Sequence, residues 1–209
     1  MATSVYIDGF NLYYGALKGR PGKWLDLQAL CRALLPRDEI TRIRYFTARA
    51  AARPHDLQVP VRQDAYLRAL ATLPLVTIHE GRFLTTTVRM ALAQPRPGWP
   101  ATVEVIKTEE KGSDVNLASY LLLDGFRQAY DTAVVISNDS DLAEPIRMVS
   151  TELGRHVGIY SPRERLSVTL REAGQAFHRR INPSAVTHSQ LPDPVIDAAG
   201  RRIAKPASW

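Results

Sequence analysis

The sequence predicts an α/β fold with a central sheet of mainly parallel strands and helices on both faces. Two observations lead to this class. Short apolar runs end in polar turns, as strands buried on both faces of a parallel sheet do. Segments with a helical apolar period alternate with these runs along the chain. With 209 residues, the chain is long enough for one domain with a sizeable core and an appendage.

The expected strands are short runs rich in apolar and β-branched residues. SVYID and TAVVIS are continuous apolar runs, whereas ITRIRYFTA alternates and carries aromatic residues. The segment LVTIHEGRF is expected to be a further strand, with TTTVRMAL as its hairpin partner. We therefore expect strands at residues 4–8, 40–48, 75–83, 85–92, 132–137 and 155–161.

Helices are expected between these strands. Leu27, Leu30, Cys31 and Leu34 share one face of the first, and Pro60 kinks the second or marks its start. The segment that begins SDVNLASYLLL has the clearest helical period. The predicted helices span residues 25–35, 55–73, 113–130, 141–153 and 163–174.

Two stretches break this alternation. Residues 93–103 contain three prolines and a glycine, so we expect a loop. From Asn182 onward the chain has four prolines and little periodicity. This tail is expected to be either disordered or held across the domain by QLPDPVI and Trp209.

The net charge is +6, and most of the excess lies near the C-terminus. Residues 1–154 hold 18 Lys and Arg against 17 Asp and Glu, whereas residues 155–209 hold 9 against 4. Clustered positive charge attracts polyanions, of which nucleic acid is the most abundant. A solvated basic tail is an equally weighted alternative.

Several classes of protein are disfavoured by what the sequence lacks. It has no apolar window long enough for a membrane span, and Asp8 interrupts its N-terminus too early for a signal peptide. The single cysteine fits a reducing cytoplasm, and neither the cysteine nor the histidines show zinc-ligand spacing. No nucleotide cofactor is expected, because GxGxxG and Walker motifs are absent, as is the GxSxG of a serine hydrolase.

Carboxylates follow the ends of two predicted strands and open one helix. Asp8 ends the first strand, Asp139 and Asp141 follow VVISN, and Asp114 opens the helix after EEKGS. Asp141 could simply cap its helix in a capping box with Glu144. The helix dipole could account for Asp114, with the preceding serine as cap.

Asp8 and Asp139 are harder to explain structurally. Carboxylates at the mouth of buried strands lose hydration and repel one another unless a cation compensates. Mg²⁺ or Mn²⁺ prefers such oxygen ligands. A divalent metal site at this edge of the sheet is therefore predicted.

Three motifs in this order resemble the NYN domain family: VYIDGFNLYYG, KGSDVNLASYLL and VVISNDSDLAEPIRMV. The likeness is to the LabA-like branch of the PIN-like metal-dependent ribonucleases. It implies a PIN-like, Rossmann-like three-layer domain at residues 1–181 and a Pro-containing basic tail at residues 182–209. It also implies RNA, single-stranded or structured, as partner. From the composition we expect a cytoplasmic protein that binds no membrane, and a homodimer is left open.

The resemblance assigns roles to particular residues. It implies Asp8, Asp114 and Asp139 as catalytic metal ligands, Asp141 as a further ligand, and Asn11 as a residue that orients substrate or a metal-bound water. Substrate contacts are expected from Ser137, Asn138, Lys111, Arg179 and Arg180. Many PIN-like nucleases carry a fourth acid, and Asp56, Asp64, Glu109 and Glu110 are the nearby acids considered for it.

These expectations amount to a metal-dependent ribonuclease. One or two Mg²⁺ or Mn²⁺ ions would activate a water for attack on a phosphodiester. Tyr13, Tyr14 and Trp99 could stack on unpaired bases, although ordinary packing is the more common role for aromatic residues. The alternatives are a nucleic-acid-binding or regulatory protein with little catalysis, and a different Mg²⁺ enzyme such as a phosphatase. Phe10 stands where a haloacid-dehalogenase-type phosphatase would have its second aspartate, which disfavours the last.

Overall fold

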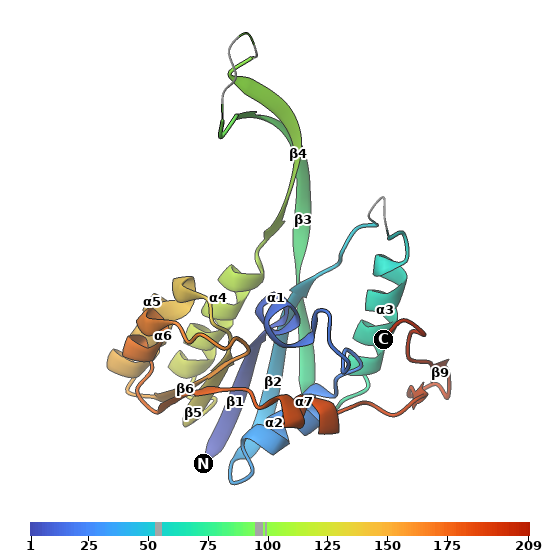
Figure 1. Ribbon diagram of the computed structural model, residues 1–209. Coiled ribbons are helices and arrows are strands. Elements are labelled where there is room, and N and C mark those ends of the chain that lie inside the picture. Colours follow the sequence, from blue (N-terminus) through green and yellow to red (C-terminus); the bar gives the residue numbers. More distant parts are fainter. Residues whose placement is uncertain (53–55, 95–97, 99) are drawn as a thin grey trace.

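The computed structural model describes residues 1–52, 56–94, 98 and 100–209 (Figure 1). Within this part of the chain, seven strands form one sheet in the order β4-β3-β2-β1-β5-β6-β7. All neighbouring pairs are parallel except β3 and β4. The strands are β1 (Ala2–Asp8), β2 (Glu39–Ala48), β3 (Val76–Ala91), β4 (Thr102–Lys111), β5 (Thr132–Ile136), β6 (His156–Ser161) and β7 (Phe177–Arg180).

The order of the strands reverses between β1 and β5. The chain builds outward from β1 through β2 and β3, and then returns to the other side of β1 to add β5, β6 and β7. In open parallel sheets, ligands bind beyond the carboxyl ends of the strands at such a switch point. Asp8 is the last residue of β1, so the fold brings this carboxylate to the switch point.

Helices cover both faces of the sheet, which gives three layers. Side chains alternate along β1, so Val5 and Ile7 enter one core and Tyr6 enters the other. The first core is covered mainly by α2 (Leu27–Leu34), α3 (Val59–Leu70) and α7 (Pro183–His188), and the second by α4 (Ser113–Phe126), α5 (Ala143–Thr151) and α6 (Val168–Ala173). The predicted α/β class with helices on both faces is therefore confirmed.

The hairpin prediction was wrong in its pairing. Residues 75–83 and 85–92 are not two partners but parts of the single strand β3, whose partner is β4. Residues 82–91 contain no glycine, proline, asparagine or aspartate, so nothing favours a turn there, and the connection to β4 comes only after Ala91. The loop predicted at 93–103 lies partly outside the described residues and ends where β4 begins at Thr102.

The paired ends of β3 and β4 form an arm that projects beyond the sheet (Figure 1). Arg82 to Ala91 pairs only with Thr102 to Lys111, because β2 pairs with β3 no further than Gly81. Large apolar side chains on the arm are open to solvent, including Ile106 at 77% exposure. The arm therefore adds nothing to the core.

The helix predictions were right in place and too long in extent. Pro60 lies in the first turn of α3, so it sets the start of this helix and does not kink it. The segment 141–153 divides into the 3-10 turn η2 (Ser140–Leu142) and α5. His55, at the predicted start of the second helix, lies outside the described residues.

A short helix was not predicted and proves important for the site. The chain turns directly from β1 into α1 (Gly9–Leu12) and the π-helix η1 (Tyr13–Leu17). A side chain on Gly9 would meet the carbonyl oxygen of Phe46 at 2.6 Å, so only glycine fits this approach to β2. The helix α1 therefore begins directly after Asp8, which is its N-cap.

The C-terminal tail is held against the domain. After α7 it forms the small hairpin of β8 (Val195–Ile196) and β9 (Arg202–Ile203). The Trp24 indole donates a hydrogen bond to the Pro192 carbonyl at 3.0 Å, and the ring of Trp209 meets that of Trp24 at 6.4 Å. Of the two expectations for the tail, the structure supports attachment.

No helix in the described residues is long and apolar enough to cross a membrane.

Candidate metal centre

Asp8 is held by two neighbours at the end of β1. One carboxylate oxygen caps α1 by accepting from the Asn11 amide at 2.9 Å, and the other accepts from the Ser137 hydroxyl at 2.8 Å. The side chain is 3% exposed. Burial raises the pKa of Asp8 above its usual value, and these hydrogen bonds lower it in part.

Asp139 lies in the turn after β5, the neighbour of β1. The Ser137 hydroxyl accepts from the Asp139 amide at 3.0 Å, so this one buried serine fixes both Asp8 and Asp139. The Asp139 carboxylate in turn caps η2 by accepting from the Asp141 amide at 3.0 Å. The interpretation of Asp141 as the cap of its helix was therefore wrong.

Asp114 reaches the same place from the first turn of α4. The N-cap is Gly112, whose φ of 103° favours glycine, so the serine predicted as cap is the first helical residue instead. The Glu110 carboxylate binds this Ser113 through its amide at 3.0 Å and its hydroxyl at 2.7 Å. These bonds anchor the start of α4, and with it Asp114, to the end of β4.

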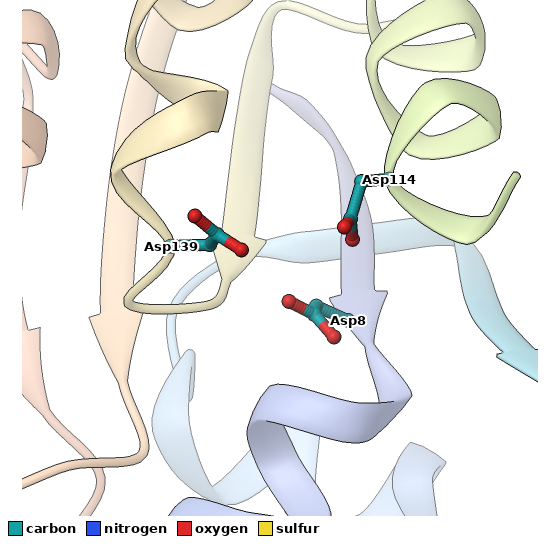
Figure 2. Close-up of side chains that lie close together, drawn as sticks. All are labelled: Asp8, Asp114 and Asp139. Atoms are coloured by element: carbon teal, nitrogen blue, oxygen red, sulfur yellow. The ribbon is translucent and has the colours of Figure 1, made fainter. Parts of the chain in front are cut away.

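The three carboxylates converge (Figure 2). One oxygen from each of Asp8, Asp114 and Asp139 lies within 4.8 Å of the others. None of the three has an ion-pair partner in the part of the chain that the structure describes. Loss of hydration and the neighbouring acids, Asp8 first and then Asp139, raise the pKa of Asp114 to about 6. The cluster is electrostatically uncompensated.

The donor set fits a hard divalent cation. Carboxylate oxygens are the ligands that Mg²⁺ and Mn²⁺ prefer, and an ion between them would offset both the repulsion and the lost hydration. Asp114 and Asp139 are less buried than Asp8, so water and a substrate can reach the side of the cluster opposite the sheet. The residues present can therefore hold Mg²⁺ or Mn²⁺.

Asn11 and Asn138 connect the two turns of the site. The Asn11 side-chain oxygen accepts from the Asn138 amide at 3.2 Å. Both polar atoms of the Asn138 side chain bind backbone atoms of Arg165 and Ser167. Ser137 is fully buried between the two carboxylates. Contacts of these three residues with substrate stay predictions.

The other predicted site residues lie outside the cluster. Asp141 is exposed on η2 and is not among the three converging carboxylates, although its charge helps to raise the pKa of Asp114. Lys111 ends β4 with its ammonium 3.5 Å from Glu109. On β7, Arg180 binds Glu164 at 2.9 Å and Arg179 lies over the ring of Phe177. Their roles in binding metal or substrate stay predictions.

The candidates for a fourth acid differ in their surroundings. Asp64 pairs with Arg49 and Arg68 away from the cluster, Asp56 pairs with Arg62, and Glu109 is engaged by two lysines. Only Glu110 acts on the cluster, where its charge contributes to the raised pKa of Asp114. Alternation along β4 points Glu109 and Glu110 to opposite faces, and Glu110 is the one that binds Ser113 at the start of α4. Which acid, if any, is a fourth ligand stays a prediction.

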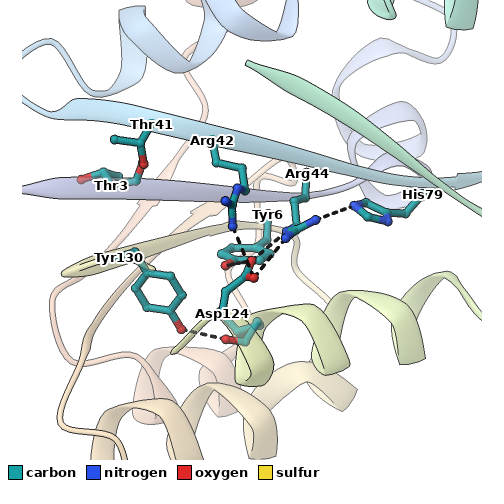
Figure 3. A network of polar contacts seen from close by, with 9 residues as sticks. Thr3, Tyr6, Thr41, Arg42, Arg44, His79, Asp124 and Tyr130 are labelled. Atoms are coloured by element: carbon teal, nitrogen blue, oxygen red, sulfur yellow. Dashed lines mark hydrogen bonds and ion pairs between the residues drawn. The ribbon is translucent and has the colours of Figure 1, made fainter. Parts of the chain in front are cut away.

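An ionic network around the buried Asp124, between β2 and α4, was not predicted (Figure 3). Asp124 on α4 accepts two hydrogen bonds from Arg44 of β2, at 2.7 and 3.0 Å, and one from the Tyr6 hydroxyl at 2.8 Å. Arg42 lies 3.4 Å from the same carboxylate, and Arg44 also contacts His79 at 2.9 Å. The sequence did carry a sign of this network: Arg42 and Arg44 are two residues apart on β2, so both side chains point to the same face of the sheet. The network fixes the helix that carries Asp114 to the sheet.

Of Tyr13 and Tyr14, which were expected to contact bases, Tyr14 is the more exposed, at 46%. It meets Tyr13 edge to face, and the Lys18 ammonium lies 4.8 Å from its ring centre. Trp99 lies outside the described residues.

Comparison with known families decides the membership of the chain. The family model of the NYN domain matches residues 2–182. The chain belongs to the NYN domain family. The three motifs that indicated this family from the sequence supply Asp8, Asp114 and Asp139, so the NYN domain is confirmed, while the LabA-like branch stays a prediction.

Two similar proteins place this NYN domain among known chains. It is 30% identical, over a 239-residue alignment, to 6-hydroxy-3-succinoylpyridine 3-monooxygenase HspA of Pseudomonas putida (strain DSM 28022 / S16), with 100% of this chain and 75% of HspA covered. The crystal structure of VPA0982, a protein of unknown function from Vibrio parahaemolyticus RIMD 2210633, superimposes with a TM-score of 0.54 at 16% identity. That match covers 87% of this chain and 93% of VPA0982 and supports the fold alone.

Proposed function

We propose that this NYN domain is a metal-dependent ribonuclease that hydrolyses phosphodiester bonds with Mg²⁺ or Mn²⁺. The observation that carries the proposal is the convergence of three carboxylates, within 4.8 Å, at the switch point of the sheet and without a basic partner. Membership of the NYN family supports a nuclease-type activity.

Each residue has a distinct part in this proposal. A divalent ion bound to the carboxylates would supply an activated water and offset charge on the phosphate. Asp8, held from two sides by Asn11 and Ser137, is the fixed ligand. Asp139 shares the same serine, and Asp114 approaches from the opposite side on α4. A histidine base is not required by this proposal, because the ion would lower the pKa of a bound water and the carboxylates beside it could accept the proton.

The test is cleavage of a labelled, structured RNA in Mn²⁺ or Mg²⁺, with and without EDTA. Products should form only with metal and should fall at least about a hundredfold in Asp139→Asn, because one of three ligands is lost. Glu152→Gln is the matched control, since Glu152 is an exposed acid at the end of α5, outside the cluster. Binding of RNA by Asp139→Asn should be intact or tighter, because one repulsive charge is removed.

A second candidate function follows from the likeness to HspA, which extends over the whole of this chain. If this chain shares that monooxygenase activity, it will consume O₂ with a hydroxypyridine and a reductant. An oxygen-electrode assay with 6-hydroxy-3-succinoylpyridine and an added two-electron reductant measures this directly. Oxygen uptake that needs the pyridine, together with no RNA cleavage, would replace the ribonuclease proposal. RNA binding without either reaction would favour a regulatory role.

A further inference from the structure

The loop that follows β6, residues 162–167, lies at the same edge of the sheet as the carboxylates. We call it the arginine loop. Its strand β6 runs parallel to β5, whose end leads to Asp139, so both turns emerge on one side. Asn138, next to Asp139, donates to the Arg165 carbonyl at 3.0 Å and accepts from the Ser167 amide at 2.8 Å. The candidate metal centre and the arginine loop are thus directly joined.

The backbone of the arginine loop is also fixed at its other end. The buried Ser161 hydroxyl accepts from the Arg163 amide and donates to the Arg163 carbonyl, both at 3.1 Å. With Asn138, two side chains therefore direct their polar atoms to this loop. A loop braced in this way presents its side chains with little further loss of entropy on binding.

The arginine loop carries positive charge that is not neutralised by an ion pair within the described residues. Arg163 and Arg165 are exposed, and neither has an ion-pair partner among the described residues. The acid between them, Glu164, is engaged by Arg180 at 2.9 Å. Arg20, in the turn after η1, is likewise exposed and without an ion-pair partner in the described part of the chain. Of these four arginines, only Arg180 has an acidic partner in the described part of the chain.

A small cavity lies next to these arginines. Its volume is about 180 Å³, below the roughly 300–1,000 Å³ typical of sites for whole small molecules. Its walls combine apolar groups with guanidinium groups: Pro21, Pro162, Pro183, Val186, Arg20 and Arg180. This lining suits a planar aromatic ring, because a guanidinium group can stack on the face of the ring and the proline side chains offer apolar contact.

The cavity is within reach of the metal centre. Pro162, in its wall, packs against Gly15 of η1. Gly15 follows Asp8 by seven residues of continuous helix, which corresponds to about 10 Å. A strand with one phosphate at the carboxylates can therefore bring a neighbouring nucleotide to the cavity.

We propose that the arginine loop and this cavity form a subsite for an unpaired polynucleotide strand. Arg163 and Arg165 bind phosphates beside the one at Asp8 and Asp139, and the cavity takes a single unstacked base. The charge is complementary to phosphate, and a base within a duplex is not free to enter a separate cavity. The inference rests on the proposed nuclease function and specifies its substrate as locally unpaired RNA.

The first test is the salt dependence of binding to a labelled oligouridylate of twelve nucleotides, measured by fluorescence anisotropy in EDTA. Binding by Arg163→Gln/Arg165→Gln should be roughly tenfold weaker, and the slope of log K against log salt should be smaller by about 1.4, because two phosphate contacts are lost. The control is Arg37→Gln/Arg127→Gln. It removes the same charge at the opposite edge of the sheet, before β2 and after α4. An equal loss in both variants would overturn the subsite.

The second test fills the cavity without changing charge. Thr187 is exposed on α7 and lines the cavity, so Thr187→Trp should weaken oligouridylate binding roughly fivefold by displacing the base. Thr151→Trp, at the exposed end of α5, is the control and should bind as wild type does. Binding by Thr187→Trp that equals wild type would remove the base from the model.

The two tests separate this inference from the proposed function. If wild type cleaves RNA with metal while the arginine variant keeps the wild-type salt slope, the subsite fails and the nuclease stands. If wild type neither binds nor cleaves RNA, both fail. Circular dichroism of each variant verifies that the surface substitutions leave the fold intact.

Discussion

At the scale of single residues, the sequence indicated which carboxylates meet but not how they are held. Asp8, Asp114 and Asp139 could be predicted because strand ends and helix starts converge at one edge of a parallel sheet. The sequence favoured Asp139 over Asp141, but it could not show that only one of them reaches the cluster, because both follow the same strand within one turn. The 3-10 geometry of η2 decides the matter by turning Asp139 inward as the cap.

This difference predicts unequal effects of two neutral substitutions. Asp139→Asn should abolish binding of Mn²⁺, whereas Asp141→Asn should weaken it no more than about threefold, since Asp141 only adds to the local negative potential. Isothermal titration with Mn²⁺ measures both affinities. Equal losses would mean that Asp141 is itself a ligand when metal is bound.

The raised pKa of Asp114 predicts how stability depends on pH without metal. Its pKa is about 6 in the folded protein compared with 3.8 ordinarily, so the folded state binds this proton more tightly than the unfolded chain. The contribution of Asp114 to the free energy of unfolding therefore falls as pH rises from about 4 to about 6. The raised pKa of Asp8 acts in the same direction.

A bound metal should offset this loss in the free energy of unfolding at pH values at which Asp114 is ionised. Mn²⁺ should raise the melting temperature more at pH 7 than at pH 5, because protons compete with the metal at the lower pH. Asp114→Asn should remove most of the difference between the Mn²⁺-induced gains in melting temperature at the two pH values. Thermal unfolding of both proteins, in EDTA and in Mn²⁺, measures the effect; an equal gain at both pH values would contradict it.

At the scale of elements, α4 was predicted from its apolar period, but its ionic anchor was not. Apolar spacing reports which face of a helix is buried and is silent about a buried carboxylate such as Asp124. The partners Arg42 and Arg44 lie on a strand far away in the sequence, so only the fold reveals the pairing. The position of α4, and thus of Asp114, depends on it.

Removing one partner of this anchor should be costly. Asp124→Leu leaves the Arg44 guanidinium buried without its carboxylate and should lower the free energy of unfolding by about 3–5 kcal/mol. The double variant Asp124→Leu/Arg44→Met should recover part of this loss. Urea unfolding of the two single variants and the double variant gives the coupling energy. A loss below about 1 kcal/mol for Asp124→Leu would show that the pair is dispensable.

The arm of β3 and β4 should behave in the opposite way. Replacing residues 85–108 by a short turn should change the melting temperature by only a few degrees, because none of the buried core residues lies in the arm. Calorimetry of the shortened chain tests this. A large drop would mean that the arm makes stabilising contacts in solution, for example with a second copy in a homodimer.

At the scale of the whole molecule, the sequence did not decide whether the C-terminal tail is disordered or held against the domain. Its few apolar residues show no period, so no helix or strand could be predicted there. The structure resolves the choice because Leu191, Val195 and Ile203 fill the core formed by α2 and α3. Such attachment depends on the shape of a surface assembled from distant segments, which sequence patterns do not encode.

Removing residues 190–209 should therefore destabilise the domain. Three buried aliphatic side chains are lost at about 1.5 kcal/mol or more each, which corresponds to roughly 10 °C in melting temperature for a chain of this size. The control is Ser208→Ala, an exposed position in the tail that leaves the buried side chains and Trp209 in place. A melting temperature equal to wild type for the truncated chain would show that the tail adds no stability.

The contact between Trp24 and Trp209 also gives the protein an intrinsic optical probe. Trp24 is 1% exposed and its indole is hydrogen-bonded to the tail, whereas Trp209 covers it from the last position of the chain. Undocking of the tail would expose the Trp24 indole to water, and its emission would shift to longer wavelength. With Trp99→Phe to remove the third fluorophore, stopped-flow fluorescence would time tail release separately from global unfolding.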